Sequence, residues 1–224
     1  LFVAAVLAVR EAARGPDSLH DAVRRGDRDA VAGLLASGAS PTLPDARGVT
    51  PIVAAVLAGD AAAIATLVAA GADVRAAPEI DSAVLVERGA PLADDAKIAL
   101  PPLVLAVFLG EHEVAQALLA AGAPVDGAVR SGETPLAVAA MTGDRPLVGT
   151  LLAAGARVDR LDADGATPLL LALRGRHVDV ARTFLESGAP VNQADHSGRT
   201  PLMAAVATGD APIVRELVGA GADV

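Results

Sequence analysis

The stretch Asp195–Val224 reads DHSGRTPLMAAVATGDAPIVRELVGAGADV and carries the signals of two short helices. Thr200 is a good N-cap residue, and Pro201 is tolerated at the first helical position, where its missing N–H needs no partner. Apolar residues follow at helical spacing until Gly209 breaks the helix. A second apolar helix ends at Gly221, a residue suited to the left-handed conformation at a helix C-terminus. The stretch therefore predicts a helix–turn–helix unit.

The same unit recurs along the chain with a fixed period. Thr-Pro pairs end at Pro135, Pro168 and Pro201, which are 33 residues apart, and a further pair ends at Pro51. Internal periods of this length are typical of stacked repeats. We predict six repeats, which start near residues 18, 51, 102, 135, 168 and 201. Gly-Ala pairs keep the same step and begin at Gly38, Gly71, Gly122, Gly155, Gly188 and Gly221.

This pattern resembles the ankyrin repeat family. The family sequence Asp-x-x-Gly-x-Thr-Pro-Leu, a short helix, a longer helix and Gly-Ala-x-Val-Asn is almost complete in Asp195–Val224, with Val191-Asn192 before it. The resemblance covers about residues 18–224 and implies an all-α solenoid of stacked helix–turn–helix units with short hairpin loops. It also implies that a partner binds along the hairpin tips and the exposed ends of the first helices of the repeats.

The chain departs from the family pattern at several positions. The family's His two places after the proline survives only as His20, and Arg176 replaces the mid-repeat Gly of the fifth repeat. Between Gly71 and Gly122 the spacing is 51 residues, which is one period plus 18. We assign this insertion to about residues 72–90.

The insertion carries a helix signal from Glu79 to Arg88, with Pro78 before it and Gly89 after it. Two interpretations stay open. The segment is either a repeat that has lost its first helix or an elaborated loop, containing a helix, that lies over the concave face. We favour the loop.

The first residues form a separate segment. Leu1–Val9 is apolar and is followed by Arg10 and Glu11. We predict that residues 1–17 form an apolar helix that covers the first repeat, and that the protein is cytoplasmic. The alternative is the tail of a signal peptide, which would place the protein in the periplasm or outside the cell.

Composition restricts the class of function. The 27 acidic against 18 basic residues give a net charge of −9, whereas non-specific nucleic-acid binding needs a basic surface. The chain has no cysteine, so disulfides and thiolate metal sites are excluded. No apolar run reaches the length of a membrane span. We predict no nucleic-acid or membrane partner, a monomeric state and, from the scarcity of lysine, a bacterial source.

Motifs of catalysis or metal binding are absent from the sequence. The four histidines are spread along the chain, and there is no Gly-x-Ser-x-Gly elbow, phosphate loop or dinucleotide fingerprint. Asp162–Gly165 is similar to part of a calcium loop, but Arg160 and Leu171 occupy its first and twelfth ligand positions. We therefore predict no catalytic, cofactor or metal site and no enzymatic activity.

The resemblance selects candidate binding residues on the hairpin tips and inner helices. Leu57, Phe108 and Leu109 form a central apolar patch, which marks an interface unless it is already covered. The inserted helix either covers it through Ile80, Val84 and Leu85 or leaves it open, with Phe108 as the anchor. The candidate set is Leu57, Phe108, Leu109, Arg130, Glu133, Met141, Arg174, His196 and Arg199.

The sequence is compatible with three candidate functions. The first is a scaffold that binds another protein on its concave face. The second is a targeting or regulatory arm of a larger protein whose activity lies outside this chain. The third is an enzyme that uses the insertion as a lid over a pocket beneath residues 78–101. We predict the first.

Overall fold

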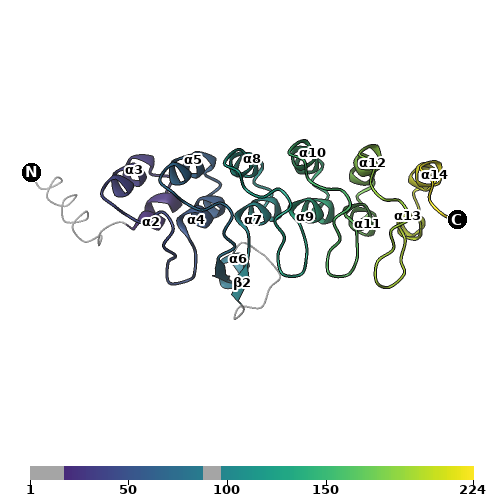
Figure 1. Ribbon diagram of the computed structural model, residues 1–224, viewed down its shortest axis with the longest axis horizontal. Helices are drawn as coiled ribbons and strands as arrows, with labels where there is room; N and C mark the ends of the chain where they lie inside the picture. The colour runs from purple at the N-terminus through teal and green to yellow at the C-terminus, as the bar shows by residue number, and fades with distance from the viewer. Residues whose placement is uncertain (1–17, 88–96) are drawn as a thin grey trace, which may run out of the picture.

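The computed structural model describes residues 18–87 and 97–224, in which helix pairs are stacked in one row (Figure 1). The first helix of each pair is called inner and the second outer. The inner helices are α2 (Leu19–Arg24), α4 (Pro51–Ala58), α7 (Pro102–Phe108), α9 (Pro135–Thr142), α11 (Pro168–Arg174) and α13 (Pro201–Thr208). The outer helices are α3 (Arg28–Ala36), α5 (Ala61–Ala69), α8 (His112–Ala120), α10 (Arg145–Ala153), α12 (Val178–Glu186) and α14 (Ala211–Gly219).

Local sequence signals set the ends of most of these helices. In α9 the hydroxyl of Thr134 accepts a hydrogen bond from the backbone N–H of Ala137 at 3.2 Å. Gly143 ends the helix in the left-handed conformation, with φ of 75°. The carboxylate of Asp144 then caps α10 by accepting from the N–H of Leu147 at 3.0 Å. The predicted helix–turn–helix unit is confirmed.

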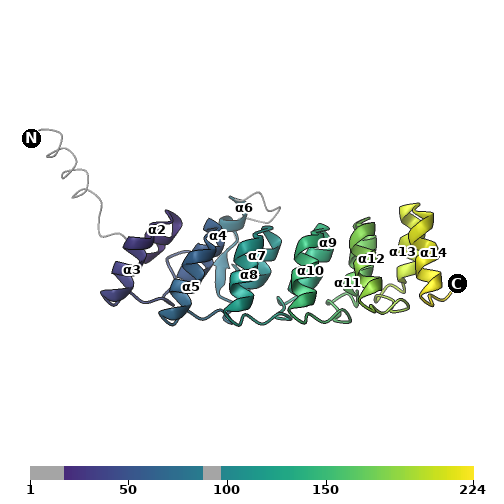
Figure 2. The same ribbon diagram turned by 90° about the horizontal axis from the view of Figure 1, so that it is seen from above.

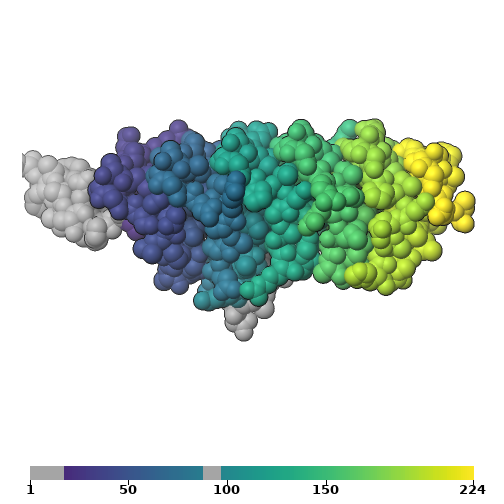
Figure 3. Space-filling model, viewed as in Figure 1, coloured from purple at the N-terminus to yellow at the C-terminus, as the bar shows by residue number. Residues whose placement is uncertain are grey.

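Neighbouring helix pairs supply each other's buried surface. Inner helices pack against the inner helices before and after them, and outer helices form a second layer (Figures 1 and 2). The core consists mainly of Ala, Val and Leu side chains, as expected for thin helical layers. The stacked pairs merge into one elongated body (Figure 3). The predicted all-α solenoid is confirmed.

Hairpin loops connect each outer helix to the next inner helix and lie on one side of the row (Figure 1). Neighbouring loops are joined at their tips by single backbone hydrogen bonds. The N–H of Ala163 donates to the carbonyl of Ser131 at 2.9 Å, and that of His196 donates to Asp164 at 2.8 Å. The five loops comprise residues 39–49, 72–100, 123–133, 156–166 and 189–199.

The extra residues lengthen the loop 72–100, which reaches further from the helices than its neighbours (Figure 1). This loop contains β1 (Glu79–Asp81), α6 (Ala83–Val86) and β2 (Lys97–Ala99). The strands are antiparallel, and Ile80 lies opposite Ile98. We call residues 79–87 and 97–99 the insertion hairpin. This arrangement matches the elaborated loop of the two interpretations.

The predicted helix from Glu79 to Arg88 is wrong in its first part, because residues 79–81 are a strand. Their backbone pairs with β2 on one side, and the N–H of Asp81 donates to the carbonyl of Arg47 at 2.9 Å on the other. This long-range pairing overrides the local helix signal, and only α6 is helical.

Some predictions fall on residues that the structure does not describe. The cap helix of residues 1–17 lies outside the described residues, and so do Arg88 and Gly89. Among the described helices, none is both long and apolar enough to span a membrane.

Candidate functional site

The exposed apolar side chains at the centre of the molecule lie on the inner helices. Phe108 on α7 is 43% exposed and Met141 on α9 is 50% exposed. Both occupy the sixth position after the proline that begins their helix, as predicted. At this position Arg24 and Arg174 lie in outlying helix pairs, α2 and α11. The inner helices therefore present an apolar centre with arginine on either side.

Phe108 and Met141 lie in a groove of about 430 Å³ between the insertion hairpin and the loop 123–133. We call it the central groove. Its lining is mostly apolar. The lining residues are Leu85, Ile98, Leu100, Val104, Phe108, Val129, Ser131, Glu133, Val138, Met141 and Thr142.

The insertion hairpin covers one part of the predicted apolar patch and leaves another part open. Ile80, Val84 and Leu85 are buried, as expected if they pack on the repeats. Val84 lines a small hollow together with Leu57, which is only 8% exposed. Phe108 remains exposed on the other side of the hairpin. Both predicted outcomes are thus realised, each over a different part of the patch.

Two stabilising devices found elsewhere in the chain are absent beside the central groove. Val129 stands at the loop position that holds Asp45, Asp162 or Asp195 in other loops, where the carboxylate accepts two backbone N–H groups. Pro101 precedes α7 without a side-chain cap. Departures from local stability rules are expected at functional sites. Here the apolar side chain of Val129 lines the groove in place of an Asp that would stabilise the loop.

Glu133 places a carboxylate at the groove wall. Its Oε2 atom is buried and has no hydrogen-bond partner, while its backbone carbonyl accepts from the N–H of Val129 at 3.1 Å. The nearby guanidinium of Arg130 points elsewhere and donates to Glu79 at 3.2 Å. A buried polar atom without a partner is costly, so a ligand that donates a hydrogen bond here relieves that cost.

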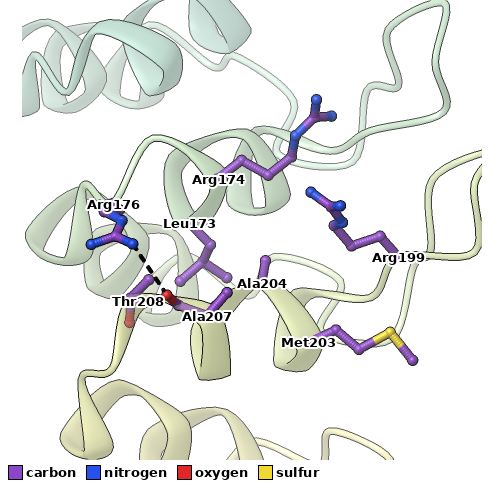
Figure 4. A pocket seen from close by; sticks show the side chains of 8 residues that line it. All are labelled: Leu173, Arg174, Arg176, Arg199, Met203, Ala204, Ala207 and Thr208. Carbon is purple, nitrogen blue, oxygen red and sulfur yellow. Dashed lines mark hydrogen bonds between the residues drawn. The ribbon is translucent and has the colours of Figure 1, made fainter.

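A second hollow of about 330 Å³ lies between α11 and α13, and three arginines line it (Figure 4). We call it the arginine hollow. Arg174 and Arg199 line one side of it, and on the opposite side Arg176 donates to the carbonyl of Ala207 at 3.5 Å (Figure 4). The Ser197 hydroxyl and the backbone N–H of Arg199 hold the pKa of Asp195 below its usual value. Asp195 lies 3.9 Å from Arg174 as an ionised neighbour.

The backbone of Arg176 is strained. Its φ is 62°, a conformation that glycine adopts in the matching turns of other repeats, as in Gly143. For an L-residue this conformation costs about 1 kcal/mol or more. Strained backbone conformations are more frequent at functional positions. Here the strained residue, Arg176, places its cationic side chain in the arginine hollow.

The predicted candidate residues divide among separate places. Phe108, Glu133 and Met141 come together in the central groove, and Arg174 and Arg199 come together in the arginine hollow. The other four do not join them. Leu57 is covered, Leu109 packs partly against the core, Arg130 pairs with Glu79, and His196 lies at a loop tip beside Gly165.

Sequence reasoning missed most of the groove wall. Ile98 belongs to a strand pair that has no local signal and Leu100 directly follows it, so their position could not be read from the sequence. Val129 could have been found, since it replaces the Asp that recurs at this loop position. Arg176 departs from the Gly of the family pattern, but nothing in the sequence indicates that it lines one hollow with Arg174 and Arg199.

Two of the histidines have side-chain contacts to a neighbouring repeat. His112 Nε2 lies 2.7 Å from the carboxylate of Asp144, and His177 Nε2 lies 3.0 Å from the carbonyl of Met141. Both contacts join neighbouring helix pairs. No group of three or more potential metal ligands occurs within residues 18–87 and 97–224.

Comparison with known proteins identifies the family. A crystal structure of an ankyrin repeat domain from Acinetobacter baumannii AYE is 30% identical in sequence and superposes with a TM-score of 0.76. The match covers 92% of this chain and 98% of that one. The chain belongs to the ankyrin repeat family. A family model described as ankyrin repeats in three copies also matches residues 137–224.

The resemblance drawn from the sequence is thus confirmed. Ankyrin repeats are generally protein–protein interaction modules, and ankyrin domains are typically not catalytic. A search among curated proteins found no match.

Proposed function

We propose that this ankyrin repeat chain binds a partner protein on the surface formed by its inner helices and hairpin loops, and that it is not itself an enzyme. The observation that carries the proposal is the exposure of Phe108 and Met141 side by side in one apolar groove. Large apolar side chains that stay exposed in a groove mark interaction sites.

The flanking charges extend the surface beyond the groove. The arginine hollow offers cationic side chains within a chain of net charge −9. A partner that buries an apolar side chain in the groove and places carboxylates near this hollow complements both features. The acidic balance of the chain supports a protein partner over nucleic acid. The stacked helices are already ordered, which lowers the entropic cost of association.

The test is affinity capture with a matched pair of variants. Phe108→Glu puts a charge into the groove, while Gln116→Glu puts the same charge on the exposed face of the outer helix α8. Proteins captured by the wild-type chain should be lost by at least about tenfold with Phe108→Glu, because an interface anchor contributes roughly 2 kcal/mol. They should be retained with Gln116→Glu.

Both variants need unchanged circular dichroism and melting temperature before capture is compared. Equal capture by the two variants would show that the partner binds elsewhere. Loss with Gln116→Glu alone would move the interface to the outer helices.

A further inference from the structure

Among residues 18–87 and 97–224, no strand pairs with one edge of the insertion hairpin. Leu100 donates to the carbonyl of Pro78 at 3.3 Å, and the register places Ile98 opposite Ile80. Hydrogen-bonded pairs alternate along an antiparallel ladder, so Ile98 and Leu100 bond to β1. The backbone N–H and C=O groups of Lys97 and Ala99 therefore point away from β1.

That free edge interrupts a chain of contacts between the hairpin loops. Loop tips on either side are joined, from Asp81 to Arg47 and from Ala163 to Ser131. Within the described residues, no hydrogen bond joins β2 to the loop 123–133. Arg130 of that loop instead forms an ion pair with Glu79 of β1. A hollow of about 200 Å³ lies between β2 and the loop 123–133, where a hydrogen bond between the two would otherwise be expected.

The hollow continues into the central groove. Ile98, Leu100, Val129 and Ser131 line both spaces. Strand edge and groove therefore form one site that presents free backbone groups, an apolar recess and, at its wall, the unpaired Oε2 of Glu133. Each of the three features lacks a partner within the described chain.

The geometry points to strand addition: an extended peptide segment of the partner pairs with the free edge of β2 through Lys97 and Ala99. One apolar side chain of the segment enters the groove against Phe108 and Met141. A Lys or Arg two residues along the segment, which lies on the same face, donates to Glu133. This inference rests on the proposed function and adds the form and chemistry of the bound segment.

The strand edge, the apolar groove and the Glu133 carboxylate each favour an extended peptide with these side chains. An unpaired strand edge is a template for another extended chain, and side chains of that chain alternate between faces, so one of them can reach the groove. A carboxylate oxygen that is buried without a partner calls for a donor. A basic side chain also fits the net charge of −9. Arg130 does not fill the role, because it already donates to Glu79.

The probe is a peptide selected from a displayed random library against the complete 224-residue chain. Selected peptides should share an apolar residue with Lys or Arg two positions away along the peptide. A synthetic copy, measured by fluorescence anisotropy, should lose at least about tenfold in affinity with Phe108→Ala. Glu133→Gln should weaken only those peptides that carry the basic residue, by about fivefold.

Backbone pairing has its own test. N-methylation along the peptide should weaken binding at alternate residues, because every second N–H faces β2. Ala99→Pro removes the edge donor while leaving the pairing of Ile98 and Leu100 with β1, and it should cost at least about tenfold in affinity. Ala99→Ser keeps the N–H and should bind normally. Circular dichroism and melting temperature verify the fold of both variants.

The outcomes separate this inference from the proposed function. Binding that depends on Phe108 but shows no alternation and no effect of Ala99→Pro would overturn strand addition and leave the protein-binding function standing. Peptides insensitive to Phe108→Ala would contradict both. Concentration-dependent dimers that disappear with Ala99→Pro, detected by sedimentation, would assign the edge to a second copy of the chain and overturn the partner peptide.

Discussion

Gly48 illustrates how closely the insertion hairpin is packed on the repeats. Its φ is 79°, and a Cβ atom added to it would lie 2.1 Å from the carbonyl oxygen of Glu79 at the start of β1. Gly198 has the same φ at the matching turn, but a Cβ there would meet nothing within 4 Å. Comparing substitutions at Gly48 and Gly198 therefore separates the free-energy cost of the left-handed backbone conformation from the cost of displacing β1.

Substitution at these two glycines gives a prediction. Gly198→Ala should lower the free energy of unfolding by about 1 kcal/mol, which is the cost of the left-handed conformation for alanine. Gly48→Ala should cost more, because the methyl group displaces the backbone of β1. Urea denaturation gives both values, and hydrogen exchange should show loss of protection in β1 for Gly48→Ala alone. Equal costs would mean that β1 moves away freely.

At the scale of elements, the hairpin loop 39–49 shows how a side chain shapes a turn. The Asp45 carboxylate accepts the backbone N–H groups of Arg47 at 2.9 Å and Val49 at 3.0 Å, and it also binds Arg24. Burial, the largest single influence, raises its pKa, but these hydrogen bonds together hold the pKa below the ordinary value of 3.8. The ionised form therefore stabilises the loop.

A pH dependence follows from this pKa. Because the folded pKa lies below the unfolded value of 3.8, the stabilisation is present above that value and is lost as the pH falls through the folded pKa. Asp45→Asn should lower the free energy of unfolding by about 1 kcal/mol at neutral pH, and the difference from wild type should disappear in the acid range below 3.8. Urea titrations at several pH values measure this.

Some helices and strands could be predicted from the sequence and others could not, depending on whether the residues that determine them are close together in the chain. Helices that begin at Thr-Pro and end at Gly were predictable, since caps and turns are set by residues a few positions apart. The strand pair was not, because Glu79–Asp81 becomes extended only through pairing with residues 97–99 and contact with Arg47. The same reason limits the site. Phe108 and Met141 follow from repeat position, whereas the wall opposite them depends on where the insertion hairpin folds back.

At the scale of the whole molecule, stability comes from neighbouring layers. Ala140 in α9 is fully buried, but Val206, at the same repeat position in α13, is 62% exposed. The pair α13 and α14 packs on a neighbour on one side only within this chain. In a solenoid each repeat depends on its intrinsic stability and on the interfaces with its neighbours.

This arrangement predicts a gradient of opening along the chain. Backbone amides of α13 and α14 should exchange at least about tenfold faster than those of α9, because they lose one stabilising interface. Hydrogen exchange followed by mass spectrometry measures the gradient in the wild-type chain. Equal protection from α9 to α14 would mean that this half of the molecule opens as a single cooperative unit.

The loop 72–100 carries 18 extra residues, yet α4 still contacts α7 and α5 still contacts α8. Helix stacking thus continues across this longer connection. In evolution, new coding segments can enter at such a tip and change what the protein recognises without compensating changes in the buried layers. For the same reason, the tip offers protein engineers a site for grafting foreign sequences onto a scaffold that keeps its fold.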